Sequence, residues 1–117
     1  MELEYSNNKV KKAFTDGAYL LKTVGLPRAK AIKLRKDQLE AFQNIRELMM
    51  SGIDNPHLLS GNLHGCIGWS VTGNLRIILD LKLEKNEAYG LEIARREKIC
   101  IKGVTDYHGG KDEWIIY

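Results

Sequence analysis

The sequence predicts an α+β fold in which two N-terminal helices pack on a small, twisted, mainly antiparallel sheet. Apolar residues recur at helical spacing in the first half of the 117-residue chain. In the second half they alternate with polar residues, and a Gly-bearing turn separates two alternating runs, as in a β-hairpin. A chain of this length holds one domain comfortably, so we expect residues 1–117 to form a single domain.

The first helical segment follows a short edge strand expected at residues 2–5. Ser6 or Asn7 supplies the side-chain oxygen that caps the helix, and Gly25 ends it. Gly17 falls inside this segment, where it costs about 1 kcal/mol relative to Ala, so packing must hold it. The apolar stripe of the helix consists of Val10, Ala13, Phe14, Leu21 and Val24.

The second helix is expected over about residues 27–49, with Pro27 at its first position. Its broad apolar stripe consists of Ala31, Leu34, Ala41, Phe42, Ile45, Leu48 and Met49. The charged residues that lie mostly away from this stripe are Arg28, Lys33, Arg35, Lys36 and Glu40. The two helices therefore offer one shared apolar face for a sheet to cover.

The sheet begins after a loop at residues 51–64. Alternating apolar residues predict a hairpin of two strands around the turn at residues 72–74; they are Ile67, Trp69 and Val71, then Leu75, Ile77, Leu79 and Leu81. Period two places Arg76 on the face opposite these leucines, where its guanidinium can donate two hydrogen bonds to a phosphate.

The remaining segments are less uniform. Residues 84–97 are highly charged, and their pattern fits a helical turn or an extra strand. Residues 98–106 form the last strand. The tail at residues 111–117 is too apolar for a free solvated end, so we expect it to pack back on the domain or to meet a partner.

The composition is typical of a globular protein of a reducing compartment. No apolar run approaches the ~18 residues of a membrane span, so we expect no membrane partner. The first residues lack the basic and apolar regions of a signal peptide, and cytoplasmic localisation is therefore predicted. Cys66 and Cys100 have neither zinc-site spacing nor the density of a disulfide scaffold, and are expected to be small buried hydrophobes.

Basic residues gather in three groups along a chain whose formal net charge is +3. The groups are Lys9, Lys11 and Lys12; Arg28, Lys30, Lys33, Arg35 and Lys36; and Arg95, Arg96 and Lys98. Each group fits either a phosphate-facing patch or a solvated face. The candidate nucleic-acid contacts are Lys30, Lys33, His64, Arg95 and Arg96.

Asp106-Tyr107-His108 at the end of the last strand is the strongest candidate for chemistry. A strand holds such groups on a rigid scaffold, and the imidazole of His108 is the side chain most often used for proton transfer. Asp106 can orient a histidine or act as a base, and Tyr107 can stack on a nucleobase or donate a hydrogen bond. Because Gly109-Gly110 follows, the same residues also fit a solvated strand end and turn.

A metal site or a cysteine nucleophile is not expected. The potential ligands His57, His64, Cys66 and His108 match no zinc pattern. Nothing in the sequence around Cys66 indicates a lowered thiol pKa. We therefore expect no metal and no cofactor.

Two segments resemble the HigB-like branch of the RelE/ParE superfamily, the toxins of bacterial toxin-antitoxin pairs. The first runs over residues 57–65, HLLSGNLHG, and 69–77, WSVTGNLRI; the second is VTDYH at residues 104–108. The resemblance covers about residues 1–108. It departs at Ser60, where the family usually has a catalytic lysine, at His64 and Leu75, where it has a basic residue and an aromatic, and at residues 84–97, which look like an insertion.

The resemblance implies a RelE/ParE-like fold and a ribosome-dependent endoribonuclease that cleaves mRNA without a metal. The site residues it implies are His57, Arg76, Asp106, Tyr107 and His108. It also implies a cognate antitoxin, a helix-turn-helix HigA-like protein, with operator DNA contacted only through that antitoxin. Two alternatives stay open: a ParE-like toxin that binds gyrase, and a non-catalytic RNA-binding relative, which Ser60 favours.

Overall fold

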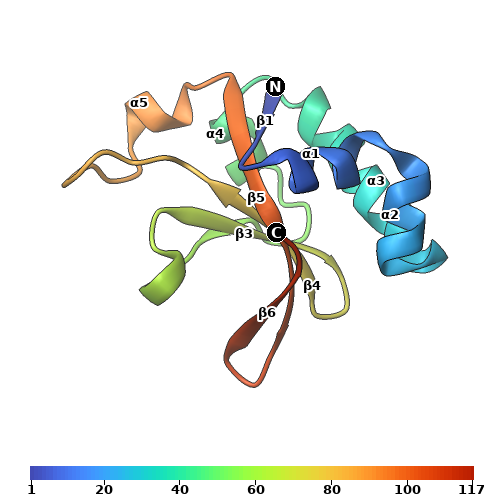
Figure 1. Ribbon diagram of the computed structural model, residues 1–117. Coiled ribbons are helices and arrows are strands. Elements are labelled where there is room, and N and C mark those ends of the chain that lie inside the picture. Colours follow the sequence, from blue (N-terminus) through green and yellow to red (C-terminus); the bar gives the residue numbers. More distant parts are fainter.

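The computed structural model describes all residues from Met1 to Tyr117 as an α+β fold with a mixed sheet (Figure 1). The elements in chain order are β1 (Glu2–Tyr5), α1 (Asn8–Thr15), α2 (Gly17–Val24), α3 (Leu26–Ala41), α4 (Ile45–Met49), β2 (His57–Leu58), the 3₁₀ helix η1 (Gly61–Leu63), β3 (Cys66–Thr72), β4 (Leu75–Asp80), α5 (Leu91–Ala94), β5 (Lys98–His108) and β6 (Lys111–Ile116). No helix has the length and apolar character needed to cross a bilayer.

The sheet has the strand order β1-β5-β4-β3-β2, and β6 adds to the same edge of β5 as β1. β1 runs parallel to residues 98–101 of β5, whereas every other pairing is antiparallel. The predicted hairpin is therefore confirmed, whereas the sheet is mixed, with one parallel pairing beside four antiparallel ones. The apolar tail packs back on the domain as the strand β6, which pairs with residues 104–108.

The predicted first helix is two helices, because Asp16 interrupts it. The Asp16 carboxylate accepts hydrogen bonds from the backbone N–H groups of Ala18 and Tyr19 at 3.1 and 3.2 Å, and so starts α2 as its N-cap. Gly17 is consequently the first residue of α2 rather than an interior position. Asn7 caps α1 as predicted.

The predicted second helix is also divided, and its buried face differs from the expected stripe. α3 ends at Ala41, since Phe42 adopts an extended conformation, and Asn44 caps the separate helix α4. Leu34 is 55% exposed, whereas Arg35, which was expected on the solvated face, is only 8% exposed. The chain turns at Phe42, so one continuous stripe does not describe both helices.

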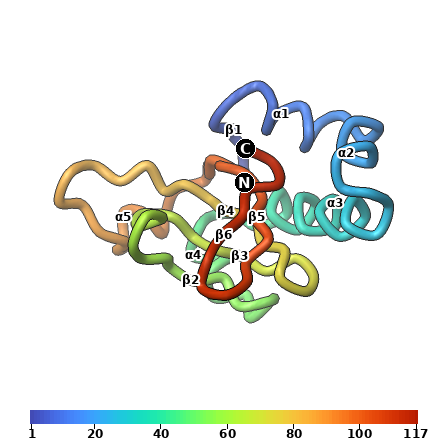
Figure 2. Tube along the Cα trace, turned by 60° about the horizontal axis from the view of Figure 1, so that its bottom comes forward, coloured from blue at the N-terminus to red at the C-terminus, as the bar shows by residue number.

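The helices cover one face of the sheet. Ile32, Leu39, Ile45 and Leu48 join Trp69, Ile77, Leu79 and Ile101 in one buried cluster. Figure 2 shows α1, α2 and α3 grouped on one side of the molecule and α5 on the other. In Figure 1 the β5–β6 hairpin reaches away from the helices. The charged segment at residues 84–97 contains only the short helix α5 and a loop that extends from the body of the molecule (Figure 1). The sheet face turned away from the helices is therefore available for a functional site.

Candidate phosphate-binding pocket

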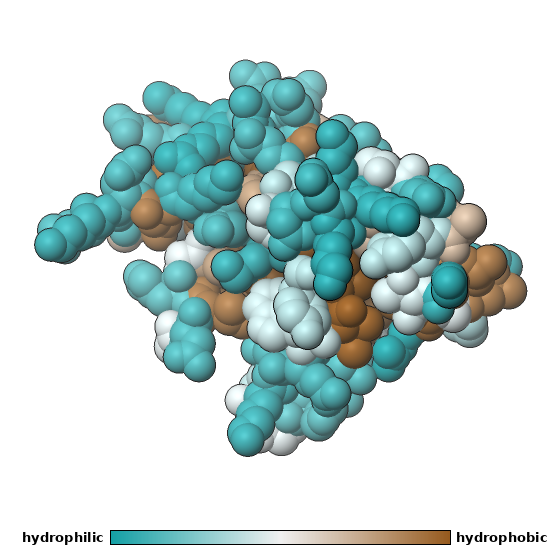
Figure 3. Space-filling view, viewed as in Figure 1, coloured by the Kyte–Doolittle hydropathy of each residue, from teal (hydrophilic) through white to brown (hydrophobic).

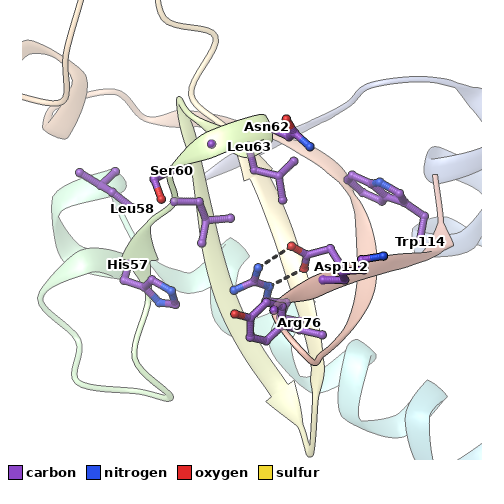
Figure 4. A pocket seen from close by; sticks show the side chains of 13 residues that line it. His57, Leu58, Ser60, Asn62, Leu63, Arg76, Asp112 and Trp114 are labelled. Atoms are coloured by element: carbon purple, nitrogen blue, oxygen red, sulfur yellow. Dashed lines mark hydrogen bonds and ion pairs between the residues drawn. The ribbon is translucent and has the colours of Figure 1, made fainter.

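A pocket of about 660 Å³ lies on the sheet face turned away from the helices (Figure 4). One wall is the segment at residues 57–63, which contains β2 and η1. The other wall is formed by the end of β5 and by β6, through Tyr107, Gly110, Lys111, Asp112 and Trp114. Arg76 lies between the two walls. We refer to this space as the Arg76 pocket.

The strand register explains why these side chains meet. In an antiparallel pair, directly opposed residues point to the same face of the sheet. His57 is opposite Gly68, Arg76 is opposite Thr105, and Asp112 is opposite Tyr107. Leu75 and Ile77, on either side of Arg76, are buried in the core beneath the helices. The predicted position of Arg76 on the face opposite the apolar residues is therefore confirmed.

The Arg76 guanidinium is held on one edge and on one face. Its Nε and Nη2 atoms donate to the two carboxylate oxygens of Asp112 at 2.8 and 2.7 Å. The Thr105 hydroxyl donates to the same carboxylate at 2.7 Å. The Tyr107 ring lies against the guanidinium, with 4.2 Å between the Arg76 Cζ atom and the ring centroid. The side chains of Arg76 and Asp112 are 12% and 17% exposed, so solvent screens the pair only weakly.

The protonation state of Asp112 follows from these contacts. Burial alone would raise the pKa of this carboxyl. The hydrogen bonds from Arg76 and Thr105, together with the positive charge of Arg76, outweigh that effect and lower the pKa below its ordinary value. Asp112 is therefore ionised at neutral pH, and the pair with Arg76 is intact.

The Nη1 atom of Arg76 is directed toward β3. A Cβ atom at position 68 would lie 3.3 Å from Nη1 and 3.0 Å from a methyl carbon of Leu59, so Gly68 leaves the space that both side chains use. The bonds to Asp112 occupy Nε and Nη2, and the edge that contains Nη1 keeps donors for another acceptor. That edge lies on the side of the pocket where His57 stands opposite Gly68.

His57 projects into the same space from β2 (Figure 4). Its Nδ1 atom lies 2.9 Å from the backbone carbonyl oxygen of Asn55. A carbonyl only accepts hydrogen bonds, so this contact requires a proton on Nδ1 and leaves Nε2 of the neutral ring able to accept one. The arrangement therefore places a proton acceptor on the rim and a cationic donor on the floor of one pocket.

The structure divides the candidate tripeptide Asp106-Tyr107-His108 between the two faces of the sheet. Side chains alternate along β5, so Tyr107 faces the pocket while Asp106 and His108 face the other way. Asp106 pairs with Arg28 of α3 at 3.2 Å. His108 lies 3.5 Å from Asp106 and 3.8 Å from Glu113. These two residues belong to the helix side of the hairpin.

The predicted nucleic-acid contacts lie outside the Arg76 pocket. Lys30 and Lys33 line a separate hollow among α1, α2 and α3. His64 and Arg95 are exposed, and neither lines the pocket. Arg96 supports the chain, since its Nη1 atom donates to the Leu81 carbonyl oxygen at 2.7 Å. The structure therefore does not bring these five residues together with Arg76.

Three residues of the pocket were missed in the sequence: Lys111, Asp112 and Trp114. All three belong to the tail, whose apolar character alone was interpreted. The turn-forming Gly109-Gly110 followed by the alternation of Asp112 and Trp114 is the signal that indicates a further strand. Ser60, at the position where the resemblance implies a lysine, lines the pocket.

The cysteines are unsuited to nucleophilic chemistry, as expected. Both Cys66 and Cys100 are buried free thiols. Burial, with a smaller contribution from the negative charge of Asp80, raises the pKa of the Cys66 thiol to about 11. Because the thiolate is the reactive form, Cys66 is inert at neutral pH.

Comparisons with known proteins give a distant structural match. No protein-family model matches the sequence, and no curated protein matches it. Among solved structures, the YoeB-YefM complex from Staphylococcus aureus aligns with 92% of this chain and 97% of that chain, at 18% sequence identity and with a TM-score of 0.49. A likeness this distant carries no argument about family or activity.

Proposed function

We propose that this protein is the toxin of a toxin-antitoxin pair, a HigB-like endoribonuclease of the RelE/ParE superfamily that cleaves mRNA on the ribosome. The observation that carries the proposal is the free edge of Arg76 inside an open pocket, with His57 and Tyr107 beside it. A guanidinium with an available pair of donors matches phosphate oxygens, and the pocket is large enough for a nucleotide.

The proposed reaction uses only side chains of this pocket. The 2′-oxygen of a ribose attacks the adjacent phosphorus while the bond from phosphorus to the 5′-oxygen breaks, leaving a 2′,3′-cyclic phosphate and a 5′-hydroxyl. His57 accepts the proton of the 2′-hydroxyl through Nε2, and Arg76 donates to the phosphorane oxygens. Tyr107, whose ring lies against Arg76, supplies an O–H group that can protonate the departing 5′-oxygen.

Asp106 and His108 remain predicted site residues on the strength of the resemblance. In the folded chain they pair with Arg28, Glu113 and each other on the opposite side of the hairpin. A direct role for His108 therefore requires the substrate to reach around the hairpin tip. Otherwise, both residues act by fixing the strand that carries Tyr107.

The proposed antitoxin is a helix-turn-helix HigA-like protein, through which alone the toxin would contact operator DNA. Figure 3 shows apolar side chains gathered at the end of the molecule formed by α2 and α3. Leu21 and Leu26 are 45% and 53% exposed there, and Lys30 and Lys33 line the same hollow. An exposed apolar area with basic neighbours is suited to an antitoxin with acidic side chains around an apolar segment.

The test is controlled induction of the chain in a bacterial host, with growth and mRNA 5′ ends followed over the first minutes. We expect arrest and new 5′ ends inside translated messages for the wild type. His57→Ala and Arg76→Lys should both strongly reduce the new ends, whereas Asn8→Ala, an exposed and uncharged change on α1, should behave as the wild type.

Each other outcome has a distinct meaning. Arrest without new ends would indicate a protein-binding toxin such as a gyrase inhibitor. Ribosome or RNA binding without either effect would indicate a non-catalytic relative. Either result would overturn the nuclease proposal. His108→Ala separates the two roles above, because loss of the ends without loss of folding would place His108 at the substrate.

A further inference from the structure

The strand β6 brings a carboxylate to the pocket from a part of the chain that the HigB-like resemblance does not reach. The resemblance ends at about residue 108, and Asp112 lies beyond it. In the folded chain Asp112 is the partner of Arg76, although the two residues are 36 positions apart. The Asp112 carboxylate is therefore a charged group of the pocket that takes no part in the proposed reaction steps.

We propose that Asp112 is a positioning residue for RNA cleavage: together with Thr105, it fixes Arg76 so that the edge containing Nη1 meets the phosphate. This inference rests on the proposed function. It goes beyond that function by assigning a role to a residue of β6, and by stating which edge of the guanidinium binds substrate.

The geometry shows why Asp112 determines the orientation of Arg76. Two hydrogen bonds, from Nε and Nη2, hold the guanidinium in one plane relative to the carboxylate. A third bond, from the Thr105 hydroxyl, holds the carboxylate itself. Tyr107 covers one face of the guanidinium. An arginine side chain has several rotatable bonds, and these contacts together select one arrangement before substrate arrives.

Asp112 is anchored in the sheet and does not belong to a free loop. It lies in β6, directly opposite Tyr107 in the register of the β5–β6 pair. Trp114, the next residue of β6 that faces the pocket, lies opposite Thr105. The carboxylate is therefore fixed by backbone pairing as well as by its own hydrogen bonds. The Asp112 carboxylate is therefore placed to hold Arg76, and it does not move aside when a phosphate enters.

The charge of Asp112 also determines which kinetic step it affects. The ion pair leaves little net charge to attract a phosphate diester in the ground state. The Nη1 donors, held in place, interact more strongly with the phosphorane oxygens as negative charge develops on them. Loss of the contact between Asp112 and Arg76 should therefore lower the cleavage rate of the bound complex more than it lowers the affinity for RNA.

The competing role for Asp112 predicts the opposite sign. A carboxylate on an arginine can act as an internal competitor that occupies the phosphate site. Removal of its charge would then tighten substrate binding and would leave the cleavage rate equal or higher. The isosteric change Asp112→Asn distinguishes the two roles in one experiment.

The experiment measures single-turnover cleavage of a defined mRNA on purified ribosomes, as the maximal rate and as the protein concentration that gives half of it. For Asp112→Asn we expect the maximal rate to fall about 10- to 100-fold while the half-saturating concentration changes less than about threefold. Thr105→Val, which keeps the ion pair but removes the third hydrogen bond, should lower the rate about three- to tenfold. Thr105→Ser should restore it, because it keeps the hydroxyl.

A double-mutant cycle separates positioning from loss of folding. In an Arg76→Lys background the Asp112→Asn change should cost less than about threefold, because there is no guanidinium to orient. Each variant is measured below its own melting temperature, with near-UV circular dichroism matching the wild type. Asn8→Ala, an exposed change on α1, serves as the control.

The outcomes are distinguishable from a failure of the proposed function. A wild-type chain that does not cleave mRNA on ribosomes ends the proposed function itself. A wild-type chain that cleaves, with Asp112→Asn as fast or faster, overturns the positioning role. That role is also overturned if the effects of Asp112→Asn and Arg76→Lys multiply independently.

Discussion

Arg35 lies over the ring of Trp69, with 5.4 Å between its Cζ atom and the ring centroid, at the contact between α3 and β3. Its Nε atom donates to the Ser70 carbonyl oxygen at 3.1 Å, and its Nη1 atom donates to Gln38 at 2.7 Å. Asp54 supplies the opposite charge. Burial lowers the pKa of Arg35 from its ordinary value, yet an arginine remains charged at neutral pH. This one residue joins the helix layer to the strand that precedes Arg76.

Arg35→Ala should therefore destabilise the fold. The change removes the contact with Trp69 and two hydrogen bonds from a charged group, so we expect a loss of about 2–4 kcal/mol in the free energy of unfolding. Urea titration followed by fluorescence measures it. Lys33→Ala is the matched control on the same helix, because Lys33 is exposed and pairs only with Asp37, and should change stability by less than about 0.5 kcal/mol. Equal stability of the two variants would contradict this role of Arg35.

Gly68→Ala should disturb the pocket without unfolding the chain. The added Cβ would lie 3.0 Å from Leu59 and 3.3 Å from Arg76, so both side chains must shift by a few tenths of an ångström. We expect about a tenfold loss of mRNA cleavage with a small loss of stability. Gly17→Ala is the control, since a Cβ there has no neighbour within 4 Å. Full activity in Gly68→Ala would mean that the Nη1 edge of Arg76 does not meet substrate.

Gly103→Ala should detach β6 from β5. Gly103 adopts a φ of 158°, and a Cβ there would clash with the backbone oxygen of Ile116 and would lie 2.9 Å from the ring of Trp114. The backbone of β6 cannot approach β5 past that atom. We expect a red shift of tryptophan emission from Trp114 and faster proteolysis of the tail. Trp69 stays fully buried in the core and gives a constant background. An unchanged emission spectrum would show that β6 tolerates the methyl group.

The pairing of Asp112 predicts a specific dependence of stability on pH. The pKa of Asp112 is lower in the folded chain than its ordinary value. Its stabilising contribution is therefore present above the ordinary carboxyl pKa, about 4, and is lost as the pH falls through the lower folded value. We expect the stability difference between wild type and Asp112→Asn to be constant from pH 7 to pH 5 and to shrink below pH 4. Urea titrations across this range measure it. A difference that stays constant down to pH 3 would indicate that the pair does not set the pKa.

The strands of the hairpin and the strand from Lys98 could be predicted because they depend on the alternation of neighbouring apolar and polar residues. The hairpin, the outward position of Arg76 and the strand from Lys98 follow from alternation. The division of Asp106 from Tyr107 follows from the same rule once the strand is known to continue to His108. It was missed because the last residues of that strand were interpreted as a strand end.

The helical half shows where local patterns compete. Asp16 fits the interior of a helical pattern, but its carboxylate captures two backbone N–H groups and starts a new helix. Leu34 and Arg35 occupy adjacent positions of α3, and periodicity favoured the leucine for the core. The structure buries the arginine instead, because Trp69, Ser70 and Asp54 offer it partners.

The sequence by itself determined the hairpin, the strand that begins at Lys98 and the face of the hairpin that carries Arg76, because these depend on residues within a few positions of one another. Only the tertiary structure decided that Asp112 is the partner of Arg76 and that His57 shares the pocket with them. Strand order and register join residues far apart in the chain, and they are set by the combined pairing and packing of the whole sheet. No short stretch of sequence contains that information.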